Sequence, residues 1–199
     1  MAFDFGYFNS HSKQLVSNGL DARFSKEWTI NARLPISKEF TLKTLGLQSQ
    51  NENKSAYQAE RNFQITSSEL VPALVWQPQS NLRLNIDFRQ AIKEGRSNTE
   101  LEQKTKLAAV TLGGRWTKGG ANALNANFAW TEIKYDGDLN TAMSYEMLEA
   151  LQPGTNYSWQ INFNHKLLSG LQLNLSYNGR QSANSKMVHM GSMQVTALF

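Results

Sequence analysis

The chain has 199 residues, enough for one compact domain or one medium-sized barrel. Mean hydropathy is −0.48 and no stretch approaches the ~18 consecutive apolar residues of a membrane-spanning helix, which excludes a helical membrane protein. The net charge of +4 is scattered along the chain, which argues against nucleic acid as a partner, and the absence of Cys excludes disulfides, thiolate metal sites and cysteine nucleophiles.

Alternation of apolar and polar residues predicts β-strands along the whole chain. The clearest alternation places Leu82, Leu84, Ile86 and Phe88 on one face and Arg83, Asn85, Asp87 and Arg89 on the other. In chain order, about twelve strands are predicted, over 2–8, 19–24, 28–36, 40–50, 57–66, 70–77, 81–92, 107–117, 123–135, 157–165, 171–178 and 187–199. Strands of ~9–11 residues cross a bilayer at a tilt.

Two long connections separate these strands. Residues 93–104 are polar and charged, which predicts a solvated loop. In residues 136–155, four apolar residues share one helical face, and Pro153-Gly154 is expected to end the helix. These four are Met143, Met147, Leu148 and Leu151. Such a helix keeps the loop compact by packing on the chain itself, which is the favoured interpretation; the alternatives are folding over a barrel mouth, meeting a partner or lying in the lipid interface.

Three features favour a membrane barrel with its polar rows inward over a soluble barrel. A closed barrel of about a dozen strands is too wide for its side chains to fill, so an apolar interior would stay empty. The connections 78–80, 118–121 and 168–170 are tight, whereas the two long ones fall at the opposite ends of the strands. Aromatic residues near strand ends predict girdles at the two membrane interfaces. They are Trp116, Trp130, Tyr135, Tyr157, Trp159 and Tyr177.

The polar rows supply the candidate functional residues. Arg83, Asn85, Asp87, Arg89 and Arg115 are predicted to face the lumen. There they either set the ion preference of a pore or pair across strands and brace the barrel, and bracing is the favoured interpretation. The three histidines have no second ligand at metal-binding spacing. We therefore predict no metal site, no cofactor, no catalytic residue and no enzymatic activity.

The last predicted strand ends on Phe199, and stepping back in twos gives Ala197, Val195 and Met193. This pattern resembles the C-terminal signal by which bacterial outer-membrane barrels are recognised by the barrel assembly machinery. The sequence departs from the pattern at Ala197, where the family more often has a larger residue. From residue 145 to the end, the chain is also similar to the C-termini of large, uncharacterised surface or outer-membrane proteins of Bacteroidetes-type bacteria, which implies location and topology but no activity.

The sequence thus predicts an all-β, antiparallel transmembrane β-barrel of the bacterial outer membrane, with one short helix in an outer loop. Residues 1–199 form a single domain, and because no secretory leader is visible we expect the C-terminal portion of a longer chain. The expected function is membrane anchor or scaffold of a larger surface protein or complex. The alternatives are a porin-like pore or transporter for small solutes, and a soluble all-β binding module. Expected partners are outer-membrane lipid, the assembly machinery and other surface proteins.

Overall fold

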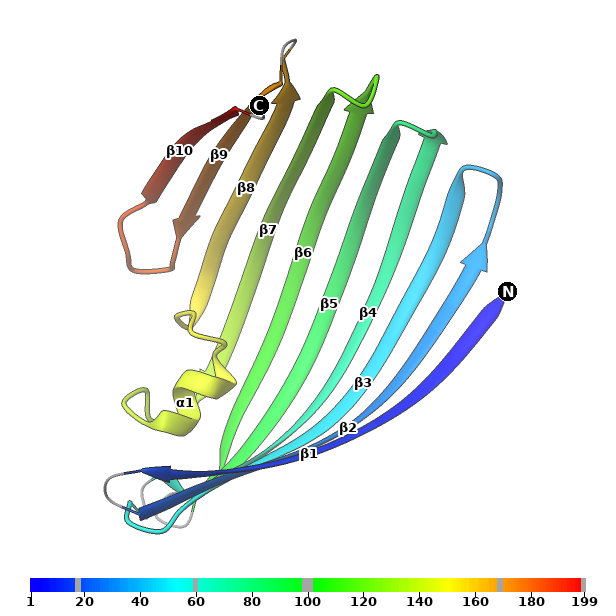
Figure 1. The fold of residues 1–199 in the computed structure, drawn as a ribbon. Helices are drawn as coiled ribbons and strands as arrows, with labels where there is room; N and C mark the ends of the chain where they lie inside the picture. Colours follow the sequence, from blue (N-terminus) through cyan, green and yellow to red (C-terminus); the bar gives the residue numbers. More distant parts are fainter. Residues whose placement is uncertain (17–18, 59–60, 98–101, 168–169, 198–199) are drawn as a thin grey trace.

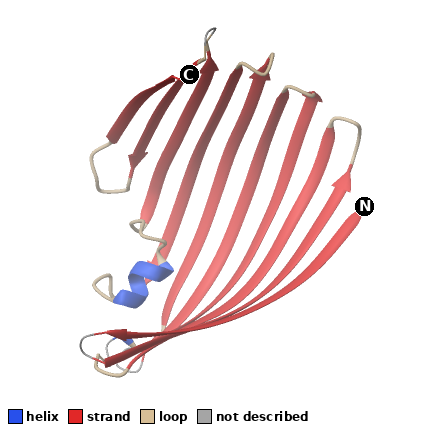
Figure 2. Ribbon diagram, viewed as in Figure 1, coloured by secondary structure: helices blue, strands red, loops and turns tan. Residues whose placement is uncertain are grey.

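The computed structural model describes residues 1–16, 19–58, 61–97, 102–167 and 170–197, which form ten strands and one short helix (Figure 2). The elements are β1 (Ala2–Val16), β2 (Gly19–Pro35), β3 (Phe40–Ser55), β4 (Phe63–Gln79), β5 (Leu82–Ser97), β6 (Gln103–Lys118), β7 (Asn122–Asp136), α1 (Ala142–Met147), β8 (Gly154–Lys166), β9 (Leu171–Gln181) and β10 (Val188–Ala197). Within these residues, no helix is long and apolar enough to cross a membrane.

All ten strands belong to one curved antiparallel sheet in which each strand pairs with the next along the chain (Figure 1). The all-β antiparallel prediction is therefore confirmed. β1 and β10 are the edges of the sheet, and no pairing joins them among the described residues. The structure thus shows an open sheet, and closure into a barrel is not seen.

The expected number of about twelve strands was too high, because two strands were each divided in the prediction. The segment 19–24 and nearly all of 28–36 lie in β2, and the end of 57–66 joins 70–77 in β4. Polar residues such as Lys26 and Ser68 weaken the alternation without changing its phase, so the backbone ladder runs past them uninterrupted. The strands β1 to β7 have 15 to 17 residues each, more than the ~9–11 that a bilayer requires.

The two ends of the sheet differ in their connections. At one end, called here the turn end, β6 and β7 are joined by residues 119–121, where Gly119 and Gly120 have φ of 60° and 66°. The opposite end, the loop end, carries the connection of residues 137–153, called here the α1 loop, which confirms the predicted long loop with a short helix. The predicted solvated loop 93–104 was wrong over most of its length. Gly95 still pairs with Gln103, so β5 and β6 continue into it.

The sheet has two chemically distinct faces because side chains alternate along each strand. The face against which α1 packs is called the loop face, and the opposite one the apolar face. Eight strands each place a large apolar side chain on the apolar face with 38 to 71% of it exposed: Ile30, Leu70, Ile86, Leu112, Phe128, Ile161, Leu175 and Met193. An exposed apolar surface of this extent marks a region covered by lipid or by another protein.

Candidate functional site

The α1 loop folds back onto the loop face and is held there by methionines. A capping box begins the helix: the Ser144 amide donates to Thr141 Oγ1 at 3.0 Å, and the Thr141 amide donates to Ser144 Oγ at 3.2 Å. Met143 and Met147 are buried and pack in one cluster with apolar side chains of β4. They fit because residue 95 is glycine: a Cβ there would lie 2.6 Å from Met147 Sδ.

The helix ends at Met147, so the prediction that Pro153-Gly154 ends it was wrong. Glu149 and Ala150 adopt φ of 56° and 61°, a left-handed conformation that costs about 1–2 kcal/mol per non-glycine residue. This sharp bend stops the helix early. It also lets Leu148 pack in a second buried cluster, with Ala91, Leu107, Ala109 and Ile133. Packing in this cluster offsets the cost of the bend.

The bend brings Glu149 to a cluster of charged groups on the loop face. Arg89 binds Glu149 with two hydrogen bonds, Nη1 to Oε2 and Nη2 to Oε1, both 2.7 Å long. Arg89 Nη2 also lies 2.6 Å from Glu69 Oε2, and Lys93 Nζ lies 2.7 Å from Glu149 Oε1. Burial raises the pKa of Glu149, but hydrogen bonds from Arg89 and Lys93 outweigh it and lower the pKa to about 2. The loop carboxylate is therefore charged at neutral pH.

The five residues predicted to face a lumen all lie on the loop face. Arg83, Asn85, Asp87 and Arg89 follow one another at alternate positions of β5, and Arg115 lies directly opposite Arg83 on β6. Among the described residues, Arg89 is the one of the five with ion pairs to other elements, which is the bracing role that the sequence interpretation favoured. Asn85 Nδ2 donates to Asp87 Oδ2 at 2.5 Å, on the same strand. Whether this face lines a lumen stays a prediction.

Arg83 and Arg115 form a basic patch towards the turn end. The two lie directly across from each other in the ladder between β5 and β6. Neither has an ion pair among the described residues. With Lys43 and Asp87, they line a hollow of about 290 Å³, whose three positive charges and one negative charge leave a net charge of +2. Like charges directly opposite each other destabilise a sheet. The net positive charge of this patch can attract anions, and no ion pair among the described residues connects either arginine to another strand.

Three members of the charge cluster were missed by sequence reasoning. Lys93 was assigned to a loop, Glu149 to a helix, and Glu69 to the gap between two predicted strands. A usable signal existed for Lys93 only. It has the same phase as Arg89 and Ala91, so extending the alternation of β5 places it on their face.

The predicted interface aromatics Trp116, Trp130, Tyr157, Trp159 and Tyr177 lie on the apolar face. Tyr135 does not: it lies on the loop face, packs against both buried clusters and hydrogen-bonds Gln103. The prediction missed Phe40 and Trp76, whose rings stack at the turn end with centroids 6.0 Å apart. Aromatic residues thus occur towards both ends of the apolar face, while their role as girdles stays a prediction.

In the predicted assembly signal, Met193, Val195 and Ala197 lie on the apolar face of β10, and Phe199 lies outside the described residues. Each of the three histidines contacts a different side chain: His11 stacks on Phe24, His165 hydrogen-bonds Asn122, and His189 hydrogen-bonds Tyr177. Within the described part of the chain, no three His, Asp or Glu residues are grouped to hold a metal ion.

The sheet is similar to those of solved outer-membrane proteins. A loop L8 deletion mutant of OmpT, an outer-membrane protein of Vibrio cholerae, matches 94% of this chain with a TM-score of 0.57 and 10% identity. The outer-membrane channel DcaP of Acinetobacter baumannii matches 96% with a TM-score of 0.55 and 10% identity. The chain shares the fold of outer-membrane β-barrels. It spans 57% and 60% of the length of these two proteins.

At this identity the similarity concerns the fold alone. No protein-family model matches the chain, and no curated protein is significantly similar to it. The resemblance to surface proteins of Bacteroidetes-type bacteria stays a prediction.

Proposed function

We propose that this chain forms the wall, or part of the wall, of a bacterial outer-membrane β-barrel channel. The α1 loop narrows the interior of this channel. The observation that carries the proposal is the division between the two faces. Large apolar side chains are exposed on eight strands of one face, whereas charged residues and the α1 loop occupy the other. A bilayer solvates the first face, and a water-filled interior solvates the second.

The membrane also sets a requirement for the sheet edges. Unpaired backbone groups in hydrocarbon cost several kcal/mol each, so spanning sheets close completely. We infer that β1 and β10 are hydrogen-bonded in the membrane, either to each other or to further strands. The greater length of the two similar outer-membrane proteins supports the second arrangement.

The basic patch favours a channel over a purely structural barrel. Bracing would place opposite charges across the ladder, whereas Arg83 faces Arg115. Lys43 and Asp87 line the same hollow, which keeps a net positive charge. Fixed positive charges on the wall of a pore attract anions. The channel is therefore proposed to prefer small anionic solutes.

A membrane anchor or scaffold of a larger surface protein or complex is the second candidate. Its support is the charge cluster around Glu149, which together with the buried methionines fixes the α1 loop on the sheet. A well-fixed loop obstructs passage and strengthens the wall. The α1 loop would then be a plug, and conduction would be absent.

Planar-bilayer recording separates the two candidates. In such recordings the full chain is expected to give conductance steps and an anion-directed reversal potential in a KCl gradient. An R83Q/R115Q variant should lose most of this preference, while K118Q/K186Q, a control that removes the same two charges outside the hollow, should keep it. Silent insertion contradicts the channel and favours the anchor. Solubility without detergent contradicts both and favours a soluble binding module.

A further inference from the structure

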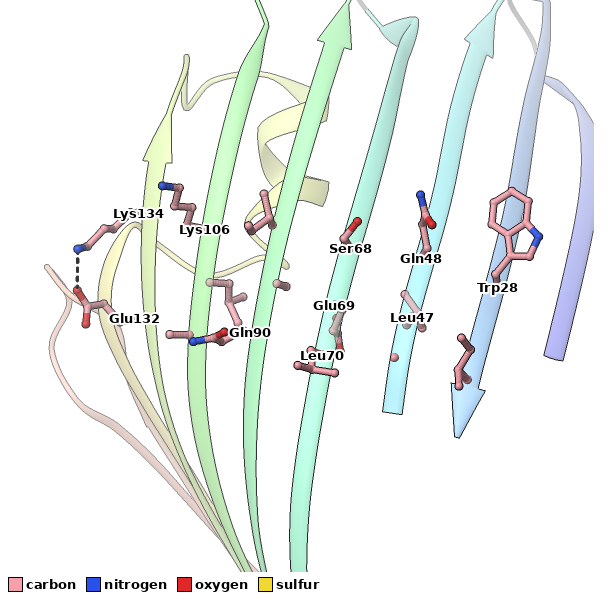
Figure 3. A pocket seen from close by; sticks show the side chains of 16 residues that line it. Trp28, Leu47, Gln48, Ser68, Glu69, Leu70, Gln90, Lys106, Glu132 and Lys134 are labelled. Carbon is pink, nitrogen blue, oxygen red and sulfur yellow. Dashed lines mark ion pairs between the residues drawn. The ribbon is translucent and has the colours of Figure 1, made fainter. Parts of the chain in front are cut away.

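A groove of about 730 Å³ lies on the apolar face, where the strands change from apolar to polar side chains (Figure 3). On β4 the change runs from Leu70 to Ser68, and on β6 from Ala108 to Lys106. Ile92 and Lys106 are neighbours in register on this face, opposite to the buried Ala91 and Leu107 of the loop face. The groove is thus on the outer side of the proposed barrel, at the boundary of its apolar belt.

Two lysines and one glutamate lie together at one side of the groove. Lys106 and Lys134 are directly opposite each other in the ladder between β6 and β7, and both are exposed. Lys134 Nζ is 4.0 Å from Glu132 Oε1, and Lys106 has no ion pair among the described residues. By contrast, Lys104 on the same strand is 2.6 Å from Glu94 Oε1. An opposed lysine pair is unfavourable unless an anion lies between the two ammonium groups.

The charge balance fits one phosphate ester. Lys106 and Lys134 contribute two positive charges and Glu132 one negative charge, leaving one net positive charge in the groove. Glu69 borders the groove, but its carboxylate is bound to Arg89 on the loop face. The neutral side chain of Gln90 lines the groove on β5, the strand next to that of Lys106, and can donate a further hydrogen bond; Ser68 lies one strand farther away (Figure 3).

We propose that this groove binds the phosphate headgroup of an anionic membrane lipid, with Lys106 and Lys134 contacting the phosphate. The acyl chains would extend from the groove over Leu70 and Ile30 towards the turn end, along the exposed apolar face. This continuity with the apolar face favours a lipid over free phosphate. The inference rests on the proposed membrane location, since only a membrane barrel exposes this face to lipid.

Lipid retention measured by native mass spectrometry tests the proposal. The full chain is reconstituted in nanodiscs of phosphatidylcholine with one-fifth phosphatidylglycerol, and is then released in mild detergent. We expect retained phosphatidylglycerol to be enriched over phosphatidylcholine. In K106Q/K134Q the enrichment should fall by about 30-fold, as expected for two lysines near an anionic surface. The control K118Q/K186Q removes the same charge outside the groove and should keep the enrichment.

Three outcomes would overturn the inference. The first is equal retention of phosphatidylglycerol by the wild type and K106Q/K134Q. The second is binding of inorganic phosphate to the same two lysines in the absence of lipid. The third is the presence of dimers or trimers of the chain that disappear in K106Q/K134Q while the bound lipid stays the same. The last outcome would assign the groove to a second copy of the chain. Failure to enter nanodiscs at all would instead contradict the proposed membrane function, so the two failures are distinguishable.

Discussion

Replacing Glu149 with glutamine should release the α1 loop from the sheet. The carboxylate accepts hydrogen bonds from both Arg89 and Lys93, which hold its pKa at about 2 against an ordinary value of 4.5. At about 1.4 kcal/mol per pKa unit, the difference corresponds to about 3 kcal/mol. The side chain is 31% exposed, so we reduce the expected loss to about 2 kcal/mol. That loss lowers the equilibrium constant for loop docking by about 30-fold.

Hydrogen exchange of the loop amides measures this loss. The amides of Leu148 and Leu151, which donate within the loop at 2.9 and 3.0 Å, should exchange up to about 30-fold faster in E149Q. Amides of β5 and β6 should keep their rates. E146Q is the matched control, because Glu146 lies 3.5 Å from an Arg23 side chain that is 63% exposed, and such pairs contribute less than about 1 kcal/mol. Unchanged exchange in E149Q, or equal acceleration in E146Q, would refute the reasoning.

Three further predictions concern the same face. In G95A the new Cβ displaces the buried methionine sulfurs and should weaken loop docking by about 1–3 kcal/mol, measured by exchange of the same amides; G46A, whose Cβ meets nothing closer than 3.9 Å, should leave them unchanged. The contribution of Glu149 to docking should be fully present above about pH 4.5 and lost as the pH falls towards 2, because folding lowers its pKa; a loss of amide protection between pH 8 and 5 would contradict this. R83E places a carboxylate opposite Arg115 and should reduce anion preference in bilayer recordings more than R83Q does, an order that a purely structural Arg83 would not produce.

The sequence by itself determined the strands and the division between their faces. Alternation with a period of two is a local property, so Leu84, Ile86 and Phe88 separate from Arg83, Asn85 and Asp87 whatever the rest of the chain does. The same pattern located the α1 loop and the sharp turns. It overestimated the number of strands because the alternation weakens at Lys26 and Ser68, where polar residues occupy the apolar face. The backbone hydrogen bonds of β2 and β4 continue past these positions, since they do not depend on side-chain polarity.

Only the tertiary structure decided where the α1 helix ends and which charges meet. Glu149 and Arg89 are 60 residues apart in the chain, and their contact depends on the register of β5, on the space left by Gly95 and on the left-handed bend after Met147. None of these is encoded in a local pattern. Arg83, Arg89 and Arg115 look alike in sequence, yet Arg89 is neutralised by two carboxylates, whereas Arg83 and Arg115 face each other and have no ion pair among the described residues. Cross-strand register makes that difference, because it assigns each arginine its neighbour.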